Sequence, residues 1–155
     1  RHNISLQQQI ELDDTTITAD PSQMKQLLLN VFMNSIQAMP NGGNLTLQVN
    51  QLPPNRVQIV FTDSGVGMPP EQVEQLFEPF SNSTTGGTGL GLSIVYQIVR
   101  DHNGTINVRS LEGEGTTITL EFPTDFRPQL SANEPEQIEQ TSRLENYLTI
   151  QSNKK

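Results

Sequence analysis

Residues 57–63, with the sequence VQIVFTD, place a carboxylate where a core side chain is expected. Side chains on a strand alternate between its two faces, so Val57, Ile59 and Phe61 share one apolar face and Asp63 continues it. An unpaired buried carboxylate costs several kcal/mol or shifts its pKa. The segment therefore predicts a strand over a core, with an inward Asp63 that either has a fixed partner in the protein or receives one from outside.

Hydrophobic periodicity predicts interspersed strands and helices along the first 123 residues. Strands are expected over residues 5–12, 45–49, 57–63, 106–108 and 116–122, and helices over 21–39, over 70–77 and from Leu90 to a close at Gly104. Asp20 is a candidate N-cap for the first helix. Because hairpin neighbours and helices are both present, we expect an α+β fold with a mixed sheet covered on one face by about three helices.

Composition limits the classes of function. The chain has 155 residues, no cysteine and a net charge of −8. The charge argues against nucleic acid as a partner, and no apolar run of about 18 residues predicts a membrane span. A cytoplasmic setting is the expected default. An anion bound by such an acidic protein must be held by backbone amides, a helix N-terminus or a metal ion.

Residues 124–155 differ in composition from the rest of the chain. They include two prolines, many Glu, Gln, Ser and Asn residues, and few large apolar side chains. We expect a disordered tail, or a short docked helix with Leu144, Tyr147 and Leu148 on one face. The sequence is thus divided into a domain over residues 1–123 and a polar tail over residues 124–155.

Asn30 and Asn34 are four residues apart on the first predicted helix. They therefore lie on the same stripe, at the border of its apolar face. Two explanations stay open: a pair of polar boundary residues, or a pair of amides offered to a metal ion or a phosphate. Mg²⁺ takes only one or two protein oxygens beside water and phosphate oxygens, so one of these amides would suffice.

The segment DSGVGMP, residues 63–69, follows the strand as a glycine-rich loop. Gly65 and Gly67 permit positive φ and the close approach of a planar ligand, although an ordinary turn would also use them. An ionised Asp63 only accepts hydrogen bonds, which suits an exocyclic amine such as that of adenine. Thr116 also points inward, either as a second polar group of the same pocket or as an ordinary core threonine.

The run GGTGLGLS, residues 86–93, precedes and opens the second long helix. Free amides at Gly87, Gly89 and Gly91, together with the helix dipole, would form an anion site. The spacing matches neither the P-loop nor G-x-G-x-x-G after a strand. The run is therefore a flexible hinge or a lid that closes over phosphates.

Taken in order, these motifs resemble one family. The boxes LLLNVFMNSIQAMPNGG (27–43), DSGVGMP (63–69), FEPF (77–80) and GTGLGLSIVYQIV (87–99) resemble the ATP-binding catalytic domain of bacterial sensor histidine kinases. Their superfamily includes DNA gyrase, mismatch-repair ATPases and heat-shock chaperones. The resemblance covers about residues 5–123. Within the family, the sequence is similar to the nitrogen-regulation and pilus-regulation branch. It implies a two-layer α/β sandwich, the Bergerat-type fold, with ATP between the helices and a mobile lid.

The resemblance also implies roles for single residues. Asp63 would accept from the adenine amine, Asn34 would coordinate Mg²⁺, and Asn30 would assist at the phosphates. The implied nucleotide contacts are Asn30, Asn34, Asp63, Gly65, Gly67, Met68, Phe80, Thr84, Gly87, Thr88, Gly89, Leu90, Gly91, Leu92 and Thr116.

The implied activity is binding of ATP with Mg²⁺ and donation of the γ-phosphoryl group to a histidine on a separate dimerisation domain. A response regulator would act downstream. Asn30 stands where ATPase relatives carry a glutamate, and an amide cannot serve as a base for water. Neither His2 nor His102 has the sequence setting of a phosphoacceptor, and we expect His102 to be structural. We therefore expect a monomeric fragment of a larger kinase, whose parent can be membrane-anchored.

One position departs from the family pattern. Thr84 stands where relatives in this branch carry a lysine. The loss of a cation beside a triphosphate motivates one alternative, a degenerate nucleotide-binding or interaction module without transfer activity. A second alternative is a serine kinase of the anti-sigma type, which shares the fold.

Overall fold

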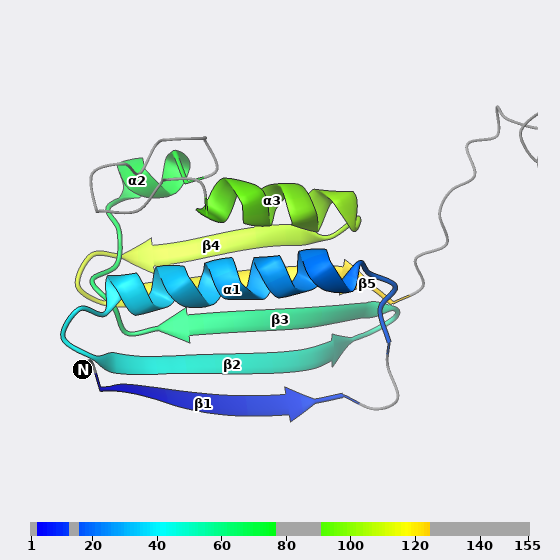
Figure 1. Ribbon diagram of the computed structural model, residues 1–155, viewed down its shortest axis with the longest axis horizontal. Coiled ribbons are helices and arrows are strands. Elements are labelled where there is room, and N and C mark those ends of the chain that lie inside the picture. The colour runs from blue at the N-terminus through cyan, green and yellow to red at the C-terminus, as the bar shows by residue number, and fades with distance from the viewer. Residues whose placement is uncertain (1–2, 13–15, 77–90, 125–155) are drawn as a thin grey trace, which may run out of the picture.

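The computed structural model describes residues 3–12, 16–76 and 91–124. They form a five-stranded sheet with helices on one face (Figure 1). The strands are β1 (Ile4–Glu11), β2 (Gly43–Leu52), β3 (Arg56–Asp63), β4 (Thr105–Leu111) and β5 (Gly115–Pro123), in the spatial order β1-β2-β3-β5-β4. The first pair is parallel and the others are antiparallel, so the expected α+β fold with a mixed sheet is confirmed.

The helices of the described segments are α1 (Pro21–Ala38), α2 (Pro70–Glu74) and α3 (Gly91–Asp101). α1 contacts β3 and α3, and α3 also contacts β4, so the two long helices form one layer over the sheet. The short α2 contacts β4. None of the three is long and apolar enough to cross a membrane.

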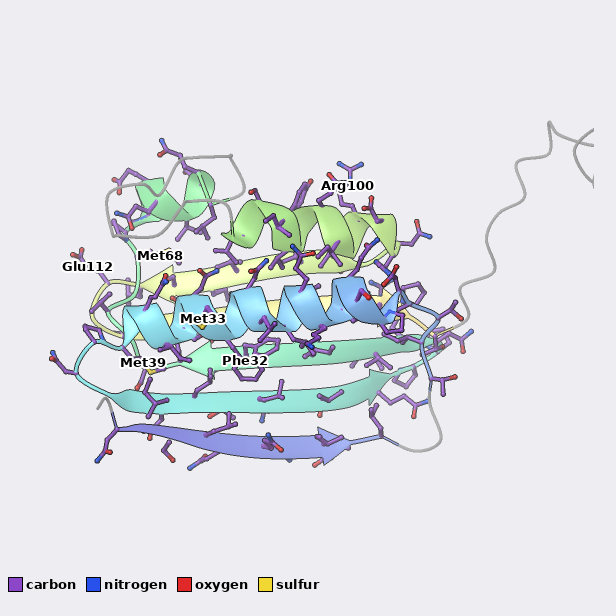
Figure 2. The ribbon with its side chains drawn as sticks, in the orientation of Figure 1. Phe32, Met33, Met39, Met68, Arg100 and Glu112 are labelled. Carbon is purple, nitrogen blue, oxygen red and sulfur yellow. The ribbon has the colours of Figure 1, made fainter. Side chains whose placement is uncertain are left out.

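The alternation of side chains along β3 builds the core. Phe61 and its β5 partner Ile118 are buried beneath the helices, whereas Thr62 and its partner Thr117 lie on the uncovered face with their hydroxyl oxygens 3.3 Å apart. The ring of Phe32, which Figure 2 labels, meets the ring of Phe61 edge-on, with centroids 5.4 Å apart. The core cluster consists of Leu27, Val31, Phe61, Val95, Ile98, Val99, Ile118, Leu120 and Phe122.

The predicted N-cap of α1 is confirmed. The Asp20 carboxylate accepts hydrogen bonds from the backbone N–H of Ser22 at 2.8 Å and of Gln23 at 3.1 Å, and Pro21 occupies the first helical position. These two bonds satisfy donors that a helix start would otherwise leave without partners. The start of α1 is therefore fixed by local chemistry.

The sequence predicted that the second long helix closes at Gly104, and in the structure α3 ends at Asp101. Asn103 has the positive φ of 53°, while the N–H of Gly104 donates to the carbonyl of Val99 at 2.8 Å, as in a Schellman motif. Gly104 is needed for another reason, because a Cβ there would lie 2.7 Å from the backbone oxygen of Glu121. The glycine allows close packing of this turn on β5.

His102 joins the end of α3 to the start of α1. Its Nε2 lies 3.0 Å from the backbone N of Asp20, and its Nδ1 lies 2.8 Å from the carbonyl oxygen of Ile98. An amide N–H can only donate, so Nε2 accepts, and Nδ1 must carry the proton and donate to Ile98. This neutral tautomer gives His102 a structural role, as the sequence predicted.

Several predicted bounds need correction. β2 continues to Leu52, beyond the expected end at residue 49, because its ladder with β3 extends to the pair Leu52–Arg56. α2 ends at Glu74, before the expected end at residue 77. The predicted lid and the tail from residue 125 lie outside the residues that the structure describes.

Candidate functional site

A cavity of about 520 Å³ opens where several elements end together. Figure 1 shows the carboxyl ends of α1 and β3, the start of α3, α2 and the β4–β5 turn at the same end of the sheet. Figure 2 shows Met33, Met68 and Glu112 at this end. The described lining residues are Asn30, Met33, Asn34, Ser35, Gln37, Ala38, Asp63, Val66, Gly67, Met68, Pro69, Gln72, Leu76, Gly91, Leu92, Glu112, Thr116 and Ile118.

Asp63 lines this cavity from the last position of β3 and is only 6 % exposed. Its Oδ1 accepts hydrogen bonds from the backbone N–H of Gly65 at 3.0 Å and of Thr116 at 3.2 Å. Burial raises the pKa of the carboxyl, and hydrogen bonds from Gly65, from the Ser35 side chain and from Thr116 act against this rise. A carboxylate has about four lone-pair positions and these three donors use three of them, so Asp63 can accept from a ligand as well.

Ser35 is a site residue that the sequence analysis missed. It is 2 % exposed, lines the cavity and hydrogen-bonds the carboxyl of Asp63. A signal was available, because Ser35 follows Leu27 and Val31 at four-residue spacing and so occupies the buried stripe of α1. A hydroxyl in an apolar stripe indicates a polar partner beneath the helix.

The two glycines of the loop after β3 have different roles. Gly67 has φ +65°, and a Cβ there would lie 1.9 Å from the backbone oxygen of Leu111. Gly65 does not take a positive φ, but a Cβ there would lie 2.6 Å from the carbonyl oxygen of Ala38. Both glycines therefore let the loop pack against protein backbone. Only Gly67 also lines the cavity.

Asn30 and Asn34 line the cavity from the middle of α1. The Nδ2 atom of each is buried and has no hydrogen-bond partner among the described residues. The Asn34 amide lies against the first residue of α3, since a Cβ on Gly91 would come 3.3 Å from both its Nδ2 and its Oδ1. Buried amide donors without partners are uncommon in proteins, so these two Nδ2 atoms are candidate donors to a ligand.

Metal binding by acidic or thiolate side chains is not indicated here. Among the described residues there is no group of three or more His, Cys, Asp or Glu side chains that could hold a metal ion. The donor set at the Asn pair is neutral, and such a site suits Mg²⁺ when phosphate oxygens supply most of the negative ligands.

Thr116 is buried, as expected, and its hydroxyl has a neighbour that the sequence analysis did not identify. Its Oγ1 lies 2.9 Å from Oγ of Ser110, which also accepts from the backbone N–H of Met68 at 2.9 Å. Ser110 follows Ile106 and Val108 on the inward face of β4 and is in register with Thr116. A polar residue on that face was the available signal.

The structure brings part of the predicted site together, and several other predicted residues lie outside the described part of the chain. Asn30, Asn34, Asp63, Gly67, Met68, Gly91, Leu92 and Thr116 line the cavity. Gly65 does not line it and acts through its bond to Asp63. Phe80, Thr84, Gly87, Thr88, Gly89 and Leu90 lie outside the described residues.

Comparison with known proteins identifies the class. The family described as "Histidine kinase-, DNA gyrase B-, and HSP90-like ATPase" matches residues 19–125, which is more than half of the chain. The chain belongs to this family.

The relatives that the chain matches include sensor histidine kinases. The sensor histidine kinase ZraS of Salmonella typhi is 41% identical over 113 residues, covering 73% of this chain and 24% of ZraS. The chain thus spans about a quarter of that relative. The catalytic domain of histidine kinase ThkA superposes with a TM-score of 0.70 at 32% identity, over 79% of this chain and 80% of that one. Full-length ShkA in complex with AMPPNP superposes with a TM-score of 0.68 at 29% identity, over 81% of this chain and 27% of ShkA.

Proposed function

We propose that this chain binds ATP with Mg²⁺ in the cavity and donates the γ-phosphoryl group to a histidine on a separate dimerisation domain of a larger sensor kinase. The observation that carries the proposal is the buried Asp63, which lines the cavity with one oxygen already fixed by two backbone donors. The ShkA structure contains AMPPNP, which supports a nucleotide as the ligand.

The base end of the cavity is the region around Asp63. A carboxylate there accepts hydrogen bonds only, and the exocyclic amine of adenine donates two. Met68, Leu76 and Ile118 add apolar surface to the lining, which suits the faces of a planar base. Because Gly65 and Thr116 hold Oδ1 in place, the acceptor is positioned before the ligand arrives.

The phosphate end is the region of Asn30, Asn34 and the start of α3. The two orphan Nδ2 donors and the backbone amides at the first turn of α3 suit phosphate oxygens. The side-chain oxygen of Asn34 is the group that we propose for Mg²⁺. When bound, the metal would neutralise phosphate charge and orient the triphosphate.

Transfer to a histidine is favoured over hydrolysis by the chemistry of the lining. Only Asp63 and Glu112 are acidic among its described residues, and neither is on α1, where the Asn pair lies. An amide at position 30 cannot remove a proton from water. Phosphoryl transfer needs mainly positioning and charge neutralisation, which this site offers to an external nucleophile.

The same proposal covers the organisation of the protein. Residues 1–123 would be the catalytic domain and residues 124–155 a polar tail. The histidine-bearing dimerisation domain would belong to the parent kinase, a response regulator would take the phosphoryl group from that histidine, and the isolated fragment would be a cytoplasmic monomer.

Calorimetry and a transfer assay test this function. ATP should bind the wild-type chain, more tightly with Mg²⁺ than with EDTA, and radiolabelled phosphate should move to an added histidine-bearing domain with little free phosphate released. Asn34→Ala should lose the Mg²⁺ dependence. Asn107→Ala, which changes an exposed residue of β4, is the matched control and should retain it. Binding without transfer would support the degenerate module, and no binding at all would overturn the proposal.

A further inference from the structure

Ser110 occupies the point where three backbone segments of the site meet. Its hydroxyl oxygen lies 2.9 Å from the backbone N of Met68, 3.0 Å from the carbonyl oxygen of Gly115 and 2.9 Å from Oγ1 of Thr116. Met68 belongs to the loop after β3, and Thr116 belongs to β5. The side chain is half-buried on the inward face of β4 and does not itself line the cavity.

The proton on this hydroxyl can be assigned by counting donors. A serine hydroxyl has one hydrogen to donate and two lone pairs that accept. The Met68 N–H can only donate, and the Gly115 carbonyl can only accept. Ser110 therefore donates to Gly115 and accepts from Met68, and its second lone pair accepts from Thr116. This is the one arrangement that satisfies all three contacts together.

The assignment determines what Thr116 offers to a ligand. Since its hydrogen points to Ser110, the Thr116 hydroxyl has only lone pairs left to offer, and Thr116 is one of the residues that line the cavity. Asp63, which accepts from the Thr116 backbone N–H at 3.2 Å, presents a carboxylate beside it. Two acceptors lie together at the base end. Such a pair binds an amine and repels a carbonyl oxygen.

We infer that Ser110 is a positioning residue for base recognition: by holding the Thr116 hydroxyl as an acceptor, it makes the cavity select a 6-amino purine over a 6-oxo purine. The inference rests on the proposed nucleotide function and deepens it. Loss of the Ser110 hydroxyl would release the hydrogen of Thr116, which could then rotate and donate to a carbonyl oxygen.

ATP and ITP are the probes that separate this role from simple support of the fold. They differ at the 6 position of the purine, where ITP carries an oxygen in place of the amine. In Ser110→Ala the ratio of Kd for ITP to Kd for ATP should fall about fivefold, as expected for one hydrogen bond gained by the 6-oxo base. A variant that merely loosened the Met68 loop would weaken both nucleotides equally and leave the ratio unchanged.

Three further variants complete the test. Ser110→Thr keeps the hydroxyl and should restore the wild-type ratio. Asn107→Ala, on the same strand and the opposite face, should not change it. In a Thr116→Val background, which lacks the hydroxyl that Ser110 orients, Ser110→Ala should have no further effect on the ratio.

The results separate the two proposals. If wild type binds ATP and the ratio is unchanged in Ser110→Ala, the positioning role is wrong while the nucleotide site stands. If the ratio falls equally in the Thr116→Val background, the effect does not pass through Thr116 and the inference is overturned. If wild type binds neither nucleotide, the proposed function fails and the inference fails with it.

Discussion

Asp63→Asn should separate ligand binding from fold stability. The asparagine keeps Oδ1, so the bonds from Gly65 and Thr116 can both remain. It removes the negative charge and places an NH₂ group where Oδ2 was. A donor then faces the exocyclic amine of the base, which is also a donor.

The loss of binding can be estimated from that single contact. A hydrogen bond to a charged group contributes about 1.5–3 kcal/mol, so Kd for ATP should rise roughly tenfold to 150-fold. The facing donors add to this loss. The effect should be the same with and without Mg²⁺, because the proposed metal ligand, Asn34, lies at the other end of the cavity.

The effect on stability should have the opposite sign. Burial raises the pKa of Asp63 above its ordinary value of 3.8. The folded state therefore holds this proton more tightly than the unfolded state, and stability is lost as pH rises from that ordinary value through the raised pKa. At pH 7 the ionised carboxylate weakens the free fold. Asp63→Asn removes this penalty and should be at least as stable as wild type.

Urea unfolding at pH 7 and at pH 4 measures the stability, and calorimetry measures ATP binding. The difference in stability between variant and wild type should be larger at pH 7. Asp101→Asn makes the same chemical change at an exposed site on α3 and should alter neither quantity appreciably. A clear loss of stability in Asp63→Asn at pH 7 would refute the reasoning that the ionised Asp63 destabilises the free protein. Unchanged ATP binding would refute the role of Asp63 as an acceptor for the ligand.

Three other predictions address the frame of the site. Gly67→Ala should destabilise the protein more than Gly113→Ala in urea unfolding, because both glycines have positive φ but only the first would place its Cβ against backbone, whereas the second faces open space. His102→Ala should lower the unfolding free energy by about 1–3 kcal/mol and leave ATP affinity unchanged, which a phosphoacceptor role would not predict. Ser35→Ala removes a hydrogen bond that lowers the pKa of the cavity carboxyl, so ATP binding should be lost at a higher pH than in wild type as the solution is acidified.

The sequence was informative where one side chain broke a strong periodic pattern. Asp63 was placed correctly because the apolar alternation of β3 leaves no other face for it. Ser35 and Ser110 break their own patterns in the same way, on α1 and β4, yet a small hydroxyl in an apolar stripe is common enough to be passed over. Their partners lie on other segments of the chain, so their roles could be recognised only once the arrangement of those segments was known.

The glycines show a second limit of sequence reasoning. Gly65 and Gly67 were predicted to permit positive φ, and only Gly67 has one. Gly65, like Gly104 at the end of α3, is required because another segment passes too close for a Cβ. Close approach is a property of tertiary packing, and neither propensity nor local spacing encodes it.

The charge of the protein limits how a triphosphate could be held in the cavity. The described lining contains no lysine or arginine, and the chain has a net charge of −8, so a triphosphate is repelled at long range. Under the proposed function, affinity would therefore come from short-range contacts: amides and Mg²⁺ at the phosphates, and Asp63 at the base. An acceptor that is fixed in advance by Gly65, Ser35 and Thr116 loses little entropy on binding. In the proposed complex, the carboxylate that weakens the free fold would therefore strengthen binding, because the amine of the base would donate to it.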